Sequence, residues 1–180
     1  YDIPVKGNVG GVGIFVSNKY KHCLATQYKI PNSTNYAVEN IWLEIYKKET
    51  KCIIGGIYRH PNQNISQFTS MLEVNLIKIS ELKTPCFIAG EINIDLAKYS
   101  THHDTNSYVD TLLLNNFIPS IVMPTFISKN FATVIDHIYF YEGNVKRKSS
   151  RNSIRSGNLW NDISDHLPNY LLLVNDAPQQ

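Results

Sequence analysis

Three short polar segments of this chain each stand at the edge of an apolar run with strand-like composition. They are residues 90–93 (Gly-Glu-Ile-Asn), 135–137 (Ile-Asp-His) and 164–166 (Ser-Asp-His). Carboxylates and an amide supply the oxygen ligands that a hard divalent cation prefers, and a histidine can move a proton near neutral pH. If one end of a sheet brings these segments together, their side chains suit metal-assisted hydrolysis of a phosphodiester.

Each segment also has an ordinary structural explanation. An Asp-His pair after a strand often caps a turn, so the combination of all three segments is what favours Asp136, Asp165 and His166 as one site. Alternation along a strand directs His137 to the face opposite Asp136, which favours a structural role for it. The neighbouring His102-His103 pair precedes a helix pattern, where a cap or a solvated loop is more common than a metal site.

The elements that would position these residues alternate between strand and helix patterns. Strands are expected at residues 12–16, 38–46, 51–58, 86–89, 118–122, 134–141 and 170–174. One helix should begin at a cap, Asn64 or Ser66, with Phe68, Leu72, Leu76 and Ile79 on its buried side, and a second should span residues 107–115. Strand pairs mixed with two crossover-length helices indicate a layered α/β sandwich.

Composition narrows the class of protein. The 180 residues, of which 43% are hydrophobic, suit one domain over residues 1–180. A formal charge of +2 is too small to indicate nucleic-acid binding by itself. Cys23, Cys52 and Cys86 form no C-x-x-C pair, which favours reduced thiols and an intracellular location. No apolar stretch approaches the length of a membrane span, so no membrane partner is expected.

Six motifs follow one another along the chain. They are G-V-G-I-F-V (11–16), W-L-E-I (42–45), G-I-Y-R-H-P-N (56–62), G-E-I-N-I-D (90–95), T-V-I-D-H-I (133–138) and S-D-H (164–166). In this order they resemble the endonuclease/exonuclease/phosphatase superfamily, and within it the apurinic-type endonuclease domain of non-LTR (LINE-type) retrotransposons. The resemblance implies a deoxyribonuclease I-like four-layer α/β sandwich that cuts DNA with Mg²⁺, or with Mn²⁺ in its place.

The resemblance also implies a role for each matching residue. Glu91 occupies the position of the family's aspartate in G-D-x-N, a general base or water-orienting carboxylate, and Asn93 matches the amide that holds the nucleophile or a phosphate oxygen. Asp165 matches the carboxylate near the metal, and His166 the imidazole that donates to the scissile phosphate. Asp136 resembles the partner that orients His166 and keeps it cationic.

Contacts to DNA are expected in two places. Tyr58 matches a phosphate-contacting phenol, and Arg59 and Thr125 are candidates for contacts to the DNA backbone. A basic segment without acidic residues contains Lys146, Arg147, Lys148, Arg151 and Arg155. It could neutralise several phosphates, and a solvated loop without a ligand is the alternative for the same residues.

The chain departs from the family pattern at two points. Glu91 is one methylene longer than the family's aspartate, and a displacement of about 1 Å can cost about a hundredfold in rate. The family's metal-binding glutamate, at the end of its second strand, has no counterpart before Glu39. We therefore expect an N-terminally incomplete domain whose leading strands lie outside this chain, and the sequence leaves open whether the chain is an active enzyme.

The expected function is that of a retrotransposon-type endonuclease that nicks DNA to prime reverse transcription. Its partners would be DNA and a reverse transcriptase domain of the same element, and it would act in the nucleus on chromosomal DNA. One alternative is a non-catalytic DNA-binding or interaction module derived from such an endonuclease. Another is a phosphoesterase acting on inositol phosphates or lipids, because a fold alone does not determine the substrate.

Overall fold

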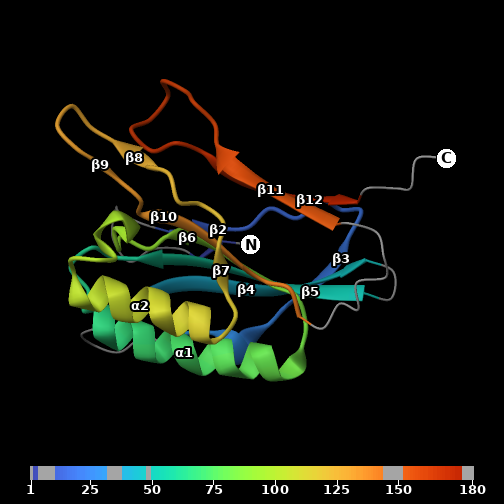
Figure 1. The fold of residues 1–180 in the computed structure, drawn as a ribbon. Coiled ribbons are helices and arrows are strands. Elements are labelled where there is room, and N and C mark those ends of the chain that lie inside the picture. Colours follow the sequence, from blue (N-terminus) through green and yellow to red (C-terminus); the bar gives the residue numbers. More distant parts are fainter. Residues whose placement is uncertain (1, 4–10, 32–37, 48–49, 144–151, 176–180) are drawn as a thin grey trace.

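The computed structural model describes residues 2–3, 11–31, 38–47, 50–143 and 152–175. Its centre is a six-stranded mixed sheet with the strand order β3-β4-β5-β6-β10-β7 (Figure 1). These strands are β3 (Lys21–Leu24), β4 (Val38–Lys47), β5 (Thr50–Arg59), β6 (Cys86–Glu91), β10 (Asp136–Tyr141) and β7 (Ile118–Pro119).

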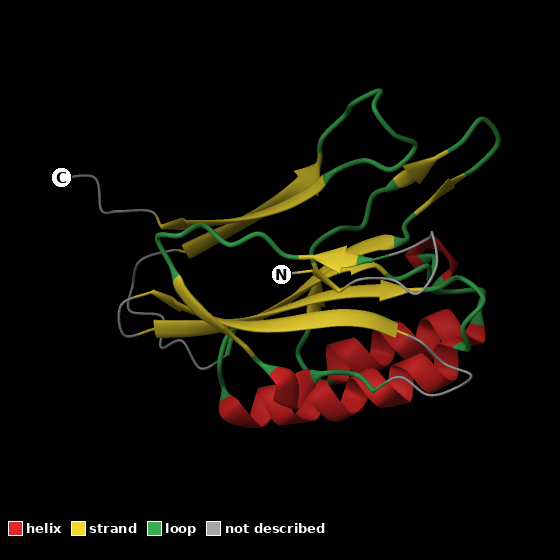
Figure 2. Ribbon diagram, turned by 180° about the vertical axis from the view of Figure 1, so that it is seen from behind, coloured by secondary structure: helices red, strands yellow, loops and turns green. Residues whose placement is uncertain are grey.

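Helices and further strand pairs lie on opposite sides of this sheet (Figure 2). Helices α1 (Ile65–Leu82) and α2 (His103–Leu114) cover one face, and the pair β11 (Asn152–Asn158) and β12 (Asn169–Asn175) lies on the other side. The remaining elements are β1 (Asp2–Ile3), β2 (Val12–Gly13), β8 (Phe126–Ile127), β9 (Ala132–Thr133), and two 3-10 turns, η1 (Thr26–Tyr28) and η2 (Leu96–Lys98). The α/β sandwich class is confirmed, and the described residues build three of the four expected layers, without a second layer of helices.

Helix α1 forms where the sequence predicts it. Asn64 is its N-cap, and the side-chain oxygen accepts a hydrogen bond from the backbone nitrogen of Gln67 at 2.8 Å. The four apolar residues at helical spacing, Phe68, Leu72, Leu76 and Ile79, are all buried. Strands β5 and β6 are parallel, so α1 is the crossover that connects them over the sheet face.

Helix α2 begins earlier than its apolar spacing indicates. His102 is the N-cap, and its Nδ1 accepts from the backbone nitrogen of Thr105 at 3.2 Å. The histidine pair before the helix therefore includes a cap, one of the two structural alternatives expected for it. Among the helices of the described residues, none has the length and hydropathy that a membrane span requires.

Several predicted strands are shorter in the structure, and five observed strands, β1, β3, β8, β9 and β11, were not predicted. The strand expected at residues 12–16 is only Val12–Gly13 in the structure. The strand expected at residues 118–122 ends at Pro119, which has no backbone N–H to donate to a neighbouring strand. Strands β1, β3, β8 and β9 are only two to four residues long, too short for a periodic pattern, and the sequence of β11 is mostly polar. Pairing with β12 at seven positions holds β11 in a strand conformation.

His137 lies in the core between the sheet and the helices and is 2% exposed. Its Nε2 donates to the backbone carbonyls of Ile94 at 3.0 Å and Val134 at 3.1 Å, which leaves Nδ1 to accept from the Tyr108 hydroxyl at 3.2 Å. Burial lowers the pKa of His137 to about 4. The expected structural role is confirmed, since the ring is neutral and all its polar atoms have partners.

The buried neutral His137 should make the stability of the fold depend on pH. The unfolded chain takes up a proton near pH 6.5 and the folded chain only near pH 4, so the stability present above pH 6.5 is lost between these values. The loss amounts to about 3 kcal/mol. Urea unfolding of the His137→Gln variant should show a weaker decline over this range. A control, His103→Gln, removes an exposed histidine and should keep the full decline; an equal decline in both variants would contradict the assignment.

Gly90 allows β5 and β6 to approach closely beside the candidate site. Its φ is +148°, and a Cβ at this position would lie 1.9 Å from the carbonyl oxygen of Ile57. Both the backbone conformation and the missing space exclude a side chain here. The close approach fixes the end of β6, from which Glu91 projects.

The Gly90→Ala variant should therefore lose about 3 kcal/mol or more of its free energy of unfolding. Chemical denaturation of the purified protein measures this loss. Gly157→Ala is the matched control, because a Cβ there would lie 3.1 Å from the flexible end of Tyr170 and should cost under about 1 kcal/mol. Similar losses in the two variants would contradict this role of Gly90, because they would show that β5 and β6 can move apart at little cost in stability.

Candidate functional site

Adjacent strands carry polar side chains on the sheet face that is opposite the helices. Asp136 on β10 pairs directly with Glu91 on β6, and Glu39 on β4 pairs with Tyr58 on β5. Neighbouring residues on these strands, such as His137 beside Asp136, point into the core between the sheet and the helices. Because side chains alternate along a strand, the four paired residues lie together on the opposite face. The result is a polar row across the strand order β4-β5-β6-β10.

Three of the predicted catalytic side chains converge in this row. Glu91, Asp136 and His166 have ligand atoms that all lie within 4.8 Å of one another. Nδ1 of His166 is 2.9 Å from Oδ2 of Asp136, and Nδ2 of Asn93 donates to Oε1 of Glu91 at 2.9 Å. The structure therefore brings together four residues, Glu91, Asn93, Asp136 and His166, that are separated by up to 75 positions in the sequence.

Thr125 holds the segments that carry Asp136 and His166. Its hydroxyl oxygen accepts from the backbone nitrogens of Ile135 at 3.1 Å and Asp136 at 3.0 Å. Its carbonyl accepts from the backbone nitrogen of Leu167 at 2.7 Å. Thr125 is 0% exposed, and the contact with DNA expected for it stays a prediction. Its side chain positions Asp136 from inside the fold.

Arg59 has a similar internal role. It is 1% exposed, Nε donates to the carbonyl of Ile92 at 2.7 Å, and Nη2 donates to the carbonyl of Asn93 at 2.7 Å. Nη1 donates to the carbonyl of Gln63. The guanidinium is thus used inside the fold, and the contact with the DNA backbone expected for Arg59 stays a prediction. It fixes the turn in which Asn93 adopts a φ of +56°.

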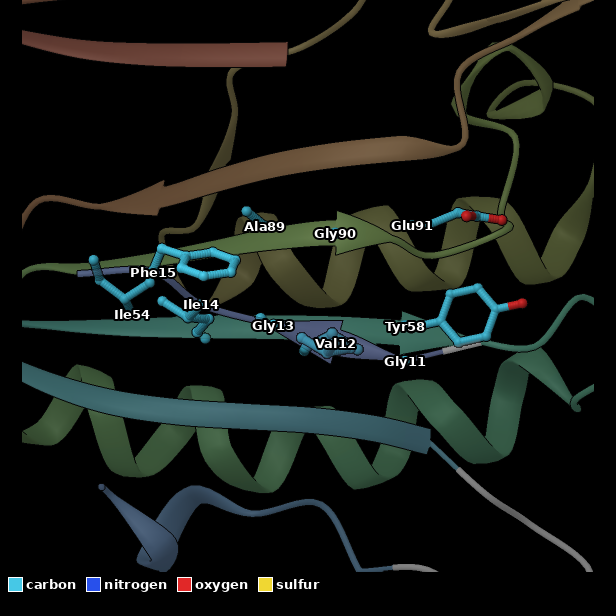
Figure 3. Close-up of a pocket in the computed structure, with 13 residues that line it drawn as sticks. Gly11, Val12, Gly13, Ile14, Phe15, Ile54, Tyr58, Ala89, Gly90 and Glu91 are labelled. Carbon is cyan, nitrogen blue, oxygen red and sulfur yellow. The ribbon is translucent and has the colours of Figure 1, made fainter. Parts of the chain in front are cut away.

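Tyr58 projects from the end of β5 toward the same face, near Glu91 (Figure 3). Partial burial raises the pKa of its phenol, and the charges of Glu91 and Glu39 raise it further. The phenol is therefore protonated at neutral pH and can donate a hydrogen bond. This suits the phosphate contact expected for it.

Two hollows adjoin these side chains. One, of about 480 Å³, lies between residues 11–15 and strands β5 and β6, and Tyr58 and Glu91 stand at one end of it (Figure 3). A second, of about 280 Å³, is lined by Glu91, Asp136 and Asn169 among others. A ligand with a phosphate could thus reach the carboxylates and His166 from the open side of the sheet.

Other predicted site residues lie apart from this group. Asp165 is exposed, and its carboxylate accepts from the Ser164 hydroxyl at 3.3 Å, outside the group formed by Glu91, Asp136 and His166. The basic residues Lys146, Arg147, Lys148 and Arg151 lie outside the described residues. Their expected contact with DNA stays a prediction.

Glu39 is a member of the polar row that no motif in the sequence singles out. It stands among apolar residues of β4, and only its pairing with Tyr58 places it beside the site. A charged residue interrupting an apolar strand was a signal, although the strand pairing needed to interpret it was not visible in the sequence.

The donor set fits a hard divalent cation. Glu91 uses Oε1 for Asn93 and Asp136 uses Oδ2 for His166, so each carboxylate keeps one oxygen without a hydrogen-bond partner in the described structure. Both side chains are partly exposed, which leaves them open to an ion from solvent. Two carboxylate oxygens are a usual protein contribution to a magnesium site that is completed by water and substrate phosphate.

Replacing Arg59 by lysine should destabilise the fold and the turn at Asn93. A lysine ammonium cannot reproduce the planar fork that reaches three carbonyls, and those left without a donor should cost about 2–4 kcal/mol in unfolding free energy. Urea denaturation tests this, with Arg155→Lys as the control because Arg155 is exposed on β11. Equal stability of Arg59→Lys and the unmodified protein would contradict the role assigned to the guanidinium.

No protein-family model matches the sequence, and the search of curated proteins also finds no match. Several solved protein structures have a fold similar to that of this chain. The endonuclease domain of TRAS1, a telomere-specific non-LTR retrotransposon, has a TM-score of 0.65 at 12% identity, covering 89% of this chain and 72% of that domain.

Two bacterial proteins of the endonuclease/exonuclease/phosphatase family are also similar. The one from Leptotrichia buccalis has a TM-score of 0.53 at 10% identity, covering 75% of this chain and 53% of that protein. The one from Bacteroides thetaiotaomicron has a TM-score of 0.50 at 15% identity, covering 78% and 56%. This chain thus spans little more than half the length of either protein. Its fold is that of the endonuclease/exonuclease/phosphatase proteins and of the TRAS1 endonuclease domain, as the order of its motifs indicated.

Proposed function

We propose that this chain belongs to a retrotransposon-type DNA endonuclease, which nicks one strand by hydrolysing a phosphodiester with Mg²⁺, or with Mn²⁺ in its place. The observation that carries the proposal is the convergence of Glu91, Asp136 and His166 within 4.8 Å on the side of the sheet opposite the helices. The fold shared with an endonuclease domain supports it.

The cation would be held by the free carboxylate oxygens of Glu91 and Asp136, with Asp165 as the further ligand that the motif resemblance assigns. When bound, Mg²⁺ supplies Lewis-acid stabilisation of the negative charge that develops on the phosphate. The protein side chains have the remaining tasks of placing water and donating hydrogen bonds.

Asp136 and His166 act as a pair. The hydrogen bond between Asp136 Oδ2 and His166 Nδ1 fixes the orientation of the ring, so Nε2 is the nitrogen that would donate to the scissile phosphate. Nε2 of His166 has no hydrogen-bond partner among the described residues. A donor held in place before the reaction stabilises the phosphorus transition state without reorganising.

Glu91 and Asn93 serve the attacking water. The Asn93 amide donates to Glu91 Oε1 and to the carbonyl of Arg59 at 2.9 Å, so it fixes the direction of the carboxylate. Glu91 would then orient the attacking water in line with the leaving oxygen, and the proton of that water would pass to solvent. Tyr58 would donate its phenolic hydrogen to a phosphate oxygen. The product would carry a 3′-hydroxyl that can prime reverse transcription.

The wider setting follows from this function. A reverse transcriptase domain of the same element would be the partner that extends the nick. The protein would work inside the cell, and in the nucleus where the target is chromosomal DNA. The basic segment around Lys146 to Arg151 would hold the DNA backbone without reading its sequence.

Replacement of either member of the Asp136–His166 pair should remove most of the activity. The conversion of supercoiled plasmid to open circle with Mg²⁺ should fall about a hundredfold or more in Asp136→Asn and in His166→Gln, and cease with a chelator. The double variant should be little worse than either single variant, because the two residues act as a unit. His103→Gln, at an exposed histidine, is the control that should keep full activity.

The same assay separates the alternatives. Full nicking by His166→Gln would contradict the proposed role of that histidine. Salt-sensitive DNA binding without any nicking would favour the non-catalytic module. Strong competition by inositol phosphates would favour a phosphoesterase with a different substrate.

A further inference from the structure

His60 and Glu39 form a pair beside the candidate site that the proposed chemistry does not use. Glu39 lies opposite Tyr58 in the β4–β5 pair, and its Oε1 is 3.6 Å from Nε2 of His60. The ring of His60 packs edge-on against the ring of Tyr58, with centroids 4.8 Å apart. The three side chains therefore form one contiguous group at the end of β5.

Glu39 is an unusual residue to bury at this position. It is 8% exposed, and its Oε2 is buried without a hydrogen-bond partner in the described structure. A buried carboxylate with an unsatisfied oxygen lowers stability unless an opposite charge compensates it. His60, when protonated, supplies that charge. A costly buried acid beside a histidine suggests that the pair is kept for a purpose other than stability.

His60 can present its second nitrogen to a ligand. With Nε2 facing Glu39, Nδ1 has no hydrogen-bond partner among the described residues, and the side chain is 32% exposed. In the Asp136–His166 pair a carboxylate likewise lies beside one ring nitrogen, there at the shorter distance of 2.9 Å, and leaves the other nitrogen free. Each pair therefore leaves one ring nitrogen available to a ligand.

The two pairs lie on either side of Tyr58 and Glu91. Glu39 is on β4 and Asp136 is on β10, with β5 and β6 between them. Two strand spacings, about 10 Å, separate β5 from β10, so a single phosphate group is too small to contact both histidines. A DNA strand crossing this face would present one phosphate to His166 and another to His60.

We propose that His60 binds a DNA phosphate that neighbours the scissile phosphate, and that Glu39 is the positioning residue that holds His60 for this contact. The proposal rests on the proposed function, because it requires DNA to cross this face of the sheet. It assigns a second anchoring point to the substrate strand, on the side of Tyr58 away from His166. Glu39 acts only through His60.

Binding of a short duplex, measured by fluorescence anisotropy with a chelator present, tests the contact without turnover. At about pH 6, His60→Gln should bind about fivefold more weakly than the unmodified protein. The slope of log affinity against log salt should fall by about 1, as for the loss of one phosphate contact. His103→Gln, at an exposed histidine, is the matched control and should change neither quantity.

Two further measurements locate the contact and test the role of Glu39. A neutral methylphosphonate, moved one position at a time along the strand, should weaken binding by the unmodified protein at one position next to the cleavage point and leave His60→Gln unaffected there. Glu39→Gln should weaken binding less than His60→Gln, and the double variant should match His60→Gln. A purely structural Glu39 would instead lower the thermal midpoint and add its own loss of affinity.

The outcomes distinguish this inference from the proposed function. If the unmodified protein nicks DNA and His60→Gln binds like His103→Gln, the inference is overturned and the proposed function stands. If the protein binds DNA without nicking, the anisotropy and methylphosphonate results still decide whether His60 contacts a phosphate. An absence of any DNA binding overturns both.

Discussion

The buried guanidinium of Arg59 is the interaction on which the candidate site depends. It ties the end of β5 to the carbonyls of Ile92 and Asn93, immediately after β6. Asn93 can then adopt its left-handed conformation and turn its amide back to Glu91. A planar fork that satisfies several carbonyls at once is rigid, so the direction of the Glu91 carboxylate is set by the core instead of by a flexible loop.

Thr125 does the same for the other half of the site. Its hydroxyl oxygen holds the entry to β10, and its carbonyl accepts from the residue after His166. The two chemical halves, Glu91 with Asn93 and Asp136 with His166, are therefore each anchored by one buried polar residue. Antiparallel pairing of β6 and β10 then sets the halves against each other. Preorganisation of this kind is what a site that stabilises a charged transition state needs.

The sequence was informative where the pattern of each segment agreed with its place in the fold. Helix α1 carries both its cap and its apolar spacing, and β4, β5 and β6 are apolar runs, so their existence followed from local pattern. Strand β11 is polar and gains its conformation from pairing with β12, which no local pattern reveals. The family resemblance placed Arg59 and Thr125 near the site, but burial depends on packing, and their internal roles emerged only from the structure.

The chemistry of the cut DNA ends is the most direct test of a nuclease site at Glu91, Asp136 and His166. End-labelled duplex DNA incubated with the protein and Mg²⁺ should be nicked to leave a 3′-hydroxyl that a polymerase extends without trimming, and Glu91→Ala protein should leave the DNA intact. Uncut DNA with the unmodified protein, or ends formed equally well by Glu91→Ala protein, would contradict the claim that this cluster forms a nuclease site.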